Sequence, residues 1–214
     1  LFRSLLTVVG TRPDLVKLAP VMPLFDRDPA IEQRLLHTGQ HYSYEMDAIF
    51  FAELGLRAPD TALQVGSQSH AGQTAAILTG VEAELLAEPA DALLVLGDTN
   101  STLGAALAAA KLGVPVIHVE AGCRSHVRTM PEEINRVLVD HCATLLLAPS
   151  AVDEAPEGLQ FTGDPIFCRP WSLLGLPCVH LPFATGSTGL PVGLQLVGRH
   201  GEDHRLLAAA EWAM

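Results

Sequence analysis

The chain alternates short apolar runs with stretches in which apolar residues recur at helical spacing. Strand-length apolar runs occupy residues 4–10, 33–39, 91–97, 114–122 and 144–150. Helical spacing covers residues 14–25, 73–88, 101–113 and 130–143, the first of these despite two internal prolines. Strands that alternate with helices predict a parallel sheet with right-handed crossovers. The pattern therefore predicts an α/β fold up to the last of these strands.

The remaining residues follow a different pattern. Residues 150–214 contain no lysine and are rich in proline and in glycine-rich loops such as 183–193. They predict a strand at 193–198 and an amphipathic helix at 202–214. We place a boundary near Pro149 or Ser150, which divides the chain into a domain over 1–149 and a short Pro/Gly-rich α+β appendage over 150–214. We expect the helix at 202–214 to pack on the first domain.

Composition excludes several classes of protein. The 214 residues carry a formal charge of −11 and include two lysines, Lys17 and Lys111, which argues against nucleic-acid binding. The apolar runs are shorter than the roughly 20 residues that a membrane helix needs. The four cysteines form no CxxC pair, so we expect free thiols, a cytoplasmic protein and no metal site.

Polar residues follow the predicted strands at the points where ligands bind in an open parallel sheet, beyond the carboxyl ends of the strands. Carboxylates and cations are expected to converge at this edge. The residues concerned are Thr11, Arg12 and Lys17 after the first strand, Gln40 and His41 after the second, Asp98 after the third and Glu120 at the end of the fourth.

The segment "GTRP" ends the first strand and opens a helix. Pro13 suits a first helical turn, where its missing N–H costs nothing. Such a turn leaves free N–H groups that form an anion site, and Arg12 and Lys17 add positive charge for a phosphate. A plain strand-to-helix turn with solvated cations is the alternative.

Asp98 and Glu120 are candidates for acid–base chemistry. Asp98 is an acid or base, or else the N-cap of a helix that begins near Ser101, because "DTNST" is rich in capping residues. Glu120 directly follows an apolar strand, so its carboxylate must be paired, hydrogen-bonded or shifted in pKa. Perturbed carboxylates at such places are candidate general acids or bases.

The segment "TMPEEINR" has a structural explanation. Thr129 and Glu132 have the spacing of a capping box. Glu132, Arg136 and Asp140 follow at steps of four residues, which predicts a ladder of ion pairs on one helix face. Spacing alone favours this structural interpretation.

Four motifs resemble the non-hydrolysing UDP-N-acetylglucosamine (UDP-GlcNAc) 2-epimerases from about Leu5 to Ser150. They are "VVGTRPDLVKLAPV", "TGQH", "LGDTNSTLGAALAAAKLGVPVIHVEAGCRS" and "RTMPEEINRVLVDH". Asp14 stands where the family usually has Glu, and Cys123 where it usually has Leu. The resemblance implies a Rossmann-like domain that is the N-terminal half of a GT-B fold. It implies inversion at C2 of UDP-GlcNAc by elimination and re-addition of UDP, with no metal or cofactor.

The resemblance also implies roles for individual residues. Asp98, Glu120 and Glu132 match carboxylates that transfer the C2 proton and stabilise the intermediate, which replaces the structural interpretation of Glu132. Arg12, Lys17 and Arg136 match substrate-binding cations. Gln40 matches a residue that contacts a second, regulatory UDP-GlcNAc. Family members are usually dimers through this domain, so a homodimer is expected.

The second domain of the epimerase family is missing from the sequence. From about residue 151 the strings "APEGLQFTGDPIFCRPWSLLGLPCVHLPF" and "GLPVGLQLVGRHGEDHRLLAAAEWA" resemble the end of amidase-signature enzymes. The Ser–Ser–Lys triad of those enzymes is not visible, which disfavours amidase activity. We therefore expect a truncated, chimeric epimerase, with a non-catalytic UDP-sugar-binding or partner-dependent module as the alternative.

Overall fold

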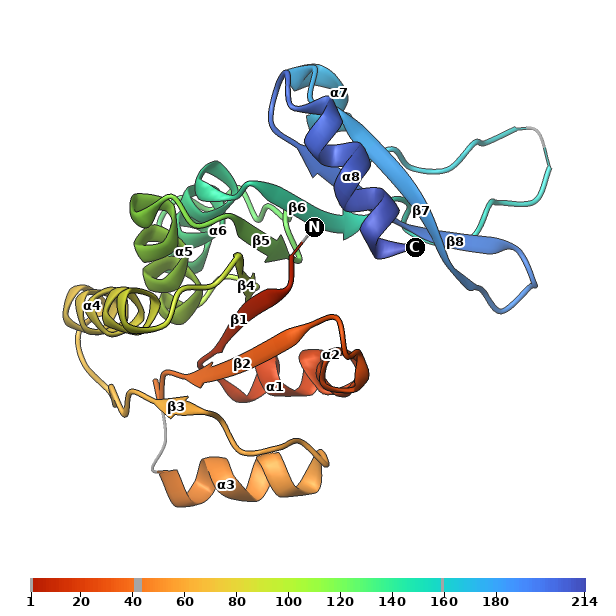
Figure 1. Ribbon diagram of the computed structural model, residues 1–214. Helices are drawn as coiled ribbons and strands as arrows, with labels where there is room; N and C mark the ends of the chain where they lie inside the picture. Colours follow the sequence, from red (N-terminus) through yellow and green to blue (C-terminus); the bar gives the residue numbers. More distant parts are fainter. Residues whose placement is uncertain (1, 41–43, 159) are drawn as a thin grey trace.

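The structure is a computed structural model that describes residues 2–40, 44–158 and 160–214. Within these residues the chain forms one eight-stranded sheet with helices on both faces (Figure 1). The strands are β1 (Ser4–Val9), β2 (Glu32–His37), β3 (Thr61–Ala62), β4 (Ala92–Leu96), β5 (Val116–Val119), β6 (Leu145–Pro149), β7 (Cys178–Thr185) and β8 (Pro191–Gly198). The helices are α1 (Arg12–Leu18), α2 (Met22–Arg27), α3 (Tyr44–Glu53), α4 (His70–Ala87), α5 (Asn100–Leu112), α6 (Pro131–Cys142), α7 (Arg169–Leu174) and α8 (Asp203–Ala213).

The first six strands form the predicted parallel sheet. Their order, β3-β2-β1-β4-β5-β6, is that of a Rossmann fold, and each neighbouring pair is parallel. The strands that follow β1 are added on one side of it as far as β3, and β4 to β6 are then added on its other side. The pair of β1 and β4 therefore forms the topological switch point, beyond whose carboxyl ends a ligand is expected.

Two apolar layers sandwich the parallel strands. Leu6 and Val8 of β1 face α4, α5 and α6, whereas Leu5 and Val9 face α1, α2 and α3. Successive side chains of a strand point to opposite faces, so both parities must be apolar when both faces are covered. This explains why the strand runs are continuously apolar and not alternating.

The predicted helix over 14–25 is wrong in one respect, because the segment forms two helices. α1 ends at Leu18 and α2 begins at Met22. Pro20 has no N–H with which to continue the hydrogen-bond ladder of α1. Pro23 lies in the first turn of α2, where a missing N–H is tolerated.

The pattern also missed α3, β3, α7 and β7. In α3 the apolar residues are spread around the helix, so no amphipathic period marked it. β3 has two residues, which is too short for a recognisable pattern.

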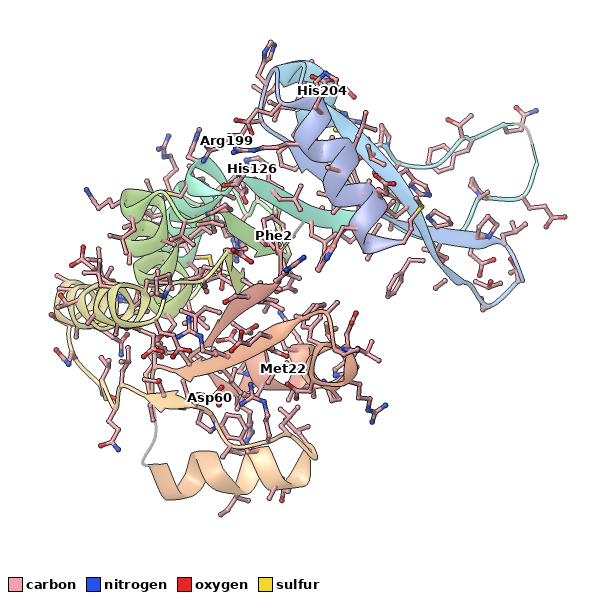
Figure 2. All side chains as sticks on the ribbon, viewed as in Figure 1. Phe2, Met22, Asp60, His126, Arg199 and His204 are labelled. Carbon is pink, nitrogen blue, oxygen red and sulfur yellow. The ribbon has the colours of Figure 1, made fainter. Side chains whose placement is uncertain are left out.

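The last part of the chain extends the same sheet. β8 pairs antiparallel with β6, and β7 pairs antiparallel with β8. Leu206 of α8 packs in a small apolar cluster that includes Leu145 and Leu147 of β6. Phe2, beside the start of β1 (Figure 2), meets the ring of Trp212 at a centroid distance of 6.0 Å. The expectation that this helix packs on the first domain is confirmed.

Helix α7 attaches residues 150–214, called the tail below, to the first domain at a second point. Trp171 is buried and belongs to the larger apolar core. Its ring lies against Gly122 in the loop after β5, where an added Cβ would come within 2.5 Å of the ring. None of the helices in the described ranges is both long and apolar enough to cross a membrane.

Candidate active site

The turn between β1 and α1 is filled by a side chain of its own helix. The carboxylate of Asp14 accepts hydrogen bonds from the N–H groups of Gly10 and Thr11 at 3.1 and 3.0 Å. Burial raises the pKa of Asp14, although these hydrogen bonds act in the opposite direction. The predicted anion site on these N–H groups is therefore wrong, because the third residue of the helix already occupies them. The nearby Arg12 guanidinium lies 4.5 Å from the ring centroid of Phe50 in α3.

Lys17 of α1 and Glu120 after β5 form an ion pair across the carboxyl edge of the sheet. The Nζ–Oε distances are 2.7 and 2.6 Å, and both side chains remain about half exposed. Glu120 has φ of +65°, which a residue with a side chain rarely adopts. The pairing agrees with the expectation that this carboxylate must have a partner, and the turned backbone places it between β5 and α1.

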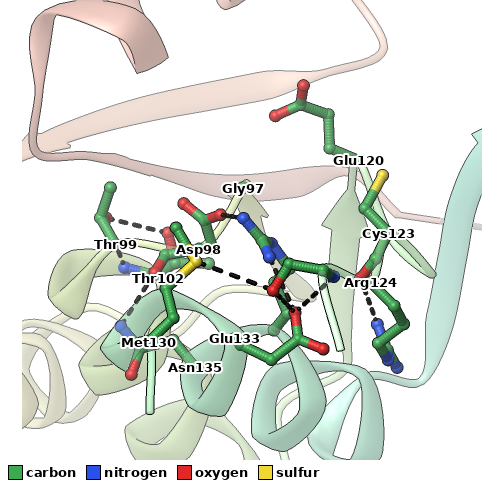
Figure 3. A network of polar contacts seen from close by, with 12 residues as sticks. Gly97, Asp98, Thr99, Thr102, Glu120, Cys123, Arg124, Met130, Glu133 and Asn135 are labelled. Carbon is green, nitrogen blue, oxygen red and sulfur yellow. Dashed lines mark hydrogen bonds and ion pairs between the residues drawn. The ribbon is translucent and has the colours of Figure 1, made fainter. Parts of the chain in front are cut away.

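Asp98 binds Arg136 of α6 at 2.6 Å. It is not the N-cap of α5, because that helix begins at Asn100 and Thr99 takes the capping position. The hydroxyl of Thr99 accepts the N–H of Thr102 at 3.2 Å. The Asp98 carboxylate is therefore not used as a helix cap and faces the guanidinium of Arg136. Figure 3 shows it at the end of β4 beside this network.

The two adjacent glutamates at the start of α6 have different surroundings. Glu133, labelled in Figure 3, is buried. It accepts the N–H groups of Ser125 and His126 at 2.9 and 3.0 Å, and it also binds Arg136 at 2.8 Å. The hydrogen bond from the Ser125 N–H is the main cause that lowers the pKa of Glu133 to about 2. Glu133 thus holds the loop before α6. Its neighbour Glu132 lines a cavity.

The two structural predictions for Glu132 are wrong. Met130 is the N-cap of α6 and makes no side-chain cap, so no capping box forms. The ladder fails because Arg136 binds Glu133 three residues before it, while Asp140 binds His118 and Arg124. Contacts outside the helix, with Asp98 for Arg136 and with His118 and Arg124 for Asp140, take the place of the ladder.

The cavity beside Glu132 has a volume of about 310 Å³ and lies between the carboxyl ends of β2 and β4. Glu132 is the one carboxylate among its described lining residues, which otherwise carry amide, hydroxyl or imidazole groups. The lining residues are Gln40, Ser67, Gln68, His70, Gln73, Thr99, Asn100, Glu132 and Asn135.

The cavity wall is held by hydrogen bonds between these polar groups. The side-chain oxygen of buried Gln40 accepts the N–H and hydroxyl of Ser101 at 3.1 and 2.6 Å. Asn135 donates to the Asp98 carbonyl at 2.8 Å, and Asn100 donates to Gln73 at 2.7 Å. The sequence analysis selected Gln40 but not Gln73, Asn100 or Asn135. The position of Asn100 just beyond a strand was the one usable signal, and no pattern marked Gln73.

The predicted residues therefore fall into three places. Lys17, Glu120, Asp98 and Arg136 gather beyond β4 and β5, where a Cβ added to Gly97 would lie 3.4 Å from the Glu120 carboxylate. Gln40 and Glu132 line the adjoining cavity, and Arg12 stacks on α3. His41 lies outside the described residues. Across the described ranges no three His, Cys, Asp or Glu side chains form a group able to hold a metal ion.

Comparison with known proteins decides the family. The sequence model described as UDP-N-acetylglucosamine 2-epimerase matches residues 24–156. The chain belongs to the UDP-N-acetylglucosamine 2-epimerase family. A UDP-N-acetylglucosamine 2-epimerase homolog of Methanococcus maripaludis is 51% identical over 147 residues, which cover 69% of this chain and 41% of that protein. A UDP-2,3-diacetamido-2,3-dideoxy-D-glucuronate 2-epimerase of Pseudomonas aeruginosa is 42% identical over 149 residues, covering 70% and 42%.

Solved structures of the epimerase family agree with the fold. The Methanocaldococcus jannaschii UDP-GlcNAc 2-epimerase, crystallised with UDP-GlcNAc and UDP, superposes with a TM-score of 0.66 at 48% identity. The match covers 69% of this chain and 40% of that one. This epimerase-family chain thus spans about two fifths of the length of the relatives it matches, and the family model ends seven residues beyond the close of β6.

A second, larger cavity lies in the tail. It has a volume of about 790 Å³ and is lined by residues 150–156, 161–165 and 168 and by the hairpin of β7 and β8. It contains none of the residues that sequence reasoning selected. All four cysteines of the chain are free thiols.

Proposed function

We propose that the chain supplies the proton-transfer half of an epimerase cleft that acts at C2 of a UDP-2-acetamido sugar, with UDP-GlcNAc as the substrate to test first. The observation that carries the proposal is the meeting of Asp98, Glu120, Lys17 and Arg136 beyond the ends of β4 and β5, with Glu132 in the adjoining cavity. This is the edge at which an open α/β sheet binds its ligand. Membership of the epimerase family supports the reaction type.

The proposed reaction needs both charges that the edge offers. A positioned carboxylate takes the C2 proton of the sugar, and the C1–O bond breaks as UDP leaves with the electron pair. The product is a 2-acetamidoglucal, to which UDP adds again while a proton returns to the other face of C2. Positive groups stabilise the departing diphosphate. We assign proton transfer and stabilisation of the intermediate to Asp98, Glu120 and Glu132, and substrate binding to Arg12, Lys17 and Arg136.

The ion pairs limit what the chain can do alone. Lys17 and Arg136 already neutralise Glu120 and Asp98, so a bound diphosphate has to compete for them. The matched relatives are more than twice as long as this match. We propose that most of the charge facing the nucleotide comes from groups outside the residues that match the family. The Pseudomonas relative is named as a 2-epimerase of a UDP-2,3-diacetamido glucuronate, so that sugar is the second substrate to test.

Three further assignments belong to the proposal. Gln40 contacts a second, regulatory UDP-GlcNAc, supported by its place in the wall of a polar cavity. Residues 1–149 form the epimerase domain and residues 150–214 a separate appendage, supported by the change to antiparallel pairing beside β6. The two amidase-like strings from about residue 151 support the derivation of the appendage from the end of an amidase-type enzyme. The protein is a cytoplasmic homodimer that binds no nucleic acid. Its free thiols and its charge of −11 support the compartment and the lack of nucleic-acid binding.

Proton NMR of the full chain with UDP-GlcNAc in D₂O tests the function. We expect deuterium to replace the proton at C2, slowly with the chain alone, and Glu120→Gln to abolish the exchange. The control is Glu82→Gln in α4, nine residues beyond Gln73 of the cavity, which should exchange like the wild type. Free UDP and 2-acetamidoglucal in the same spectra report the elimination step.

The same spectra separate the alternative functions. Perturbed UDP-GlcNAc signals without exchange at C2 would identify a non-catalytic binding module. The absence of both binding and exchange refutes the proposal. Release of ammonia from a simple amide would instead support the amidase interpretation.

A further inference from the structure

His118 lies at the centre of β5 with both ring nitrogens bonded. The residue is fully buried. Its Nδ1 is 2.7 Å from a carboxylate oxygen of Asp140 in α6, and its Nε2 is 2.8 Å from the carbonyl oxygen of Gly97. The ring therefore bridges α6 to the end of β4, through the interior of the sheet edge.

Both atoms that face the ring are oxygens. A carbonyl oxygen can only accept, and so can an ionised carboxylate. A neutral imidazole has one N–H, so it satisfies one of these oxygens and turns a bare nitrogen toward the other. The imidazolium donates to both. The remaining possibility is a neutral ring that accepts a proton from a protonated Asp140.

The surroundings of Asp140 favour the carboxylate. Its second oxygen accepts the N–H of Gly122 at 3.1 Å and pairs with Arg124 at 2.6 Å. Burial acts to raise the pKa of Asp140, but its hydrogen bonds and the charge of Arg124 outweigh burial and lower the pKa. A carboxylate that faces three donors has no reason to keep its proton.

The contacts of this pair flank two of the proposed catalytic carboxylates. Gly97 immediately precedes Asp98, and Gly122 follows Glu120 by two residues. Figure 3 shows Gly97, Asp98 and Glu120 at the same edge. Asp140 thus fixes the loop after β5 directly, and it fixes the loop after β4 through His118.

We propose that Asp140 and His118 form a positioning pair, with His118 held as the imidazolium, that sets the spacing of Asp98 and Glu120 for transfer of the C2 proton. The inference rests on the proposed function for its catalytic consequence. Its structural part, which is the protonation of the His118 ring and the hydrogen bonds of the pair to both loops, does not depend on that function.

The first test observes the ring in the full-length wild-type chain. Long-range ¹H–¹⁵N correlation spectra of ¹⁵N-labelled protein at pH 7 should show both ring nitrogens of His118 protonated. A ring with one bare nitrogen overturns the proposal. Because this measurement needs no variant, it decides the point even where a substitution prevents folding.

The second test breaks the pair. Asp140→Asn removes the counter-charge, so we expect His118 to lose one ring proton and the amide signals of Asp98 and Gly122 to shift. His141→Gln, an exposed neighbour on the same helix, is the matched control and should leave these signals in place. Unmoved Asp98 and Gly122 signals in a folded Asp140→Asn protein overturn the proposal.

Catalysis provides the third readout. We expect Asp140→Asn to slow deuterium exchange at C2 by about 10- to 100-fold, with little change in the UDP-GlcNAc concentration that gives half the maximal rate, because misplaced groups affect the reaction step most. A purely structural role would lower thermal stability and leave the rate of the folded protein unchanged, which overturns the proposal. If the wild type itself shows no exchange, the proposed function fails while the ring spectra still decide the pair.

Discussion

Substitution of Leu206 by alanine tests how firmly α8 holds the tail to the epimerase-family domain. Leu206 is 3% exposed and packs with Leu196 of β8 and Leu145 and Leu147 of β6. Its neighbour Leu207 is 58% exposed. The same substitution at these two adjacent positions therefore separates packing from helix propensity, which favours alanine equally at both.

The magnitude follows from the buried carbon groups. Leucine to alanine removes three of them, each worth about 0.8 kcal/mol, or about 2.4 kcal/mol together. The cavity left behind adds on the order of 1 kcal/mol, because the surrounding sheet relaxes only in part. We expect Leu206→Ala to lower the free energy of unfolding by about 2.5–3.5 kcal/mol. For a chain of this size that corresponds to a fall in Tm of about 5–14 °C.

Urea denaturation followed by circular dichroism measures this loss, and amide hydrogen exchange locates it. We expect faster exchange throughout α8 and β8 in Leu206→Ala. Leu207→Ala should stay within about 0.5 kcal/mol of the wild type. Equal effects of the two variants, or wild-type α8 amides that exchange as fast as an unfolded chain, would refute the reasoning that α8 is docked.

Three other predictions concern the site and its support. Gly122→Ala places a Cβ 2.5 Å from the Trp171 ring at φ of +79°, so it should lower the free energy of unfolding by at least about 2 kcal/mol. Gly175→Ala is the control, at φ of +65° with open space around it, and should lower it by about 1 kcal/mol in the same urea assay. The pKa of Glu133 falls from 4.5 to about 2 on folding. The carboxylate therefore stabilises the folded chain above pH 4.5, and this contribution is lost as the pH falls toward 2. Glu133→Gln should flatten the dependence of Tm on pH in that window, and parallel curves for the variant and the wild type would contradict this. Arg136→Lys cannot bind two carboxylates in the planar geometry of arginine, and C2 deuterium exchange should fall at least about tenfold, with unchanged exchange as the contrary result.

The helices and strands of the first domain could be predicted because each is marked by its own residues. The strand runs at 91–97 and 144–150 are apolar on both faces, and glycines at 10, 39, 97 and 122 end four of the runs. α3 and β7 carried no such mark. β7 has exposed positions along most of its length, since it is an edge strand with one hydrogen-bonded neighbour, β8.

The candidate site could be predicted in position but not in pairing. The carboxyl ends of parallel strands meet at one edge, so spacing along the chain was enough to bring Asp98 and Glu120 together. Their partners, Arg136 and Lys17, were each assigned to other contacts or to solvent. Spacing within a helix predicted a bond between Glu132 and Arg136. Arg136 instead binds Glu133 and Asp98 at the strand end, while Glu132 faces the cavity.

The sequence by itself determined the α/β fold, the family and the edge at which charged groups gather, because these depend on periodicities and motifs that are local in the chain. Only the tertiary structure decided that Asp14 fills the turn after β1, that Glu133 holds a loop while Glu132 faces a cavity, and that β8 joins β6. Each of these depends on which group lies nearest in space among several of the same chemical type. Distances between residues far apart in the chain make that choice, and no local pattern contains them.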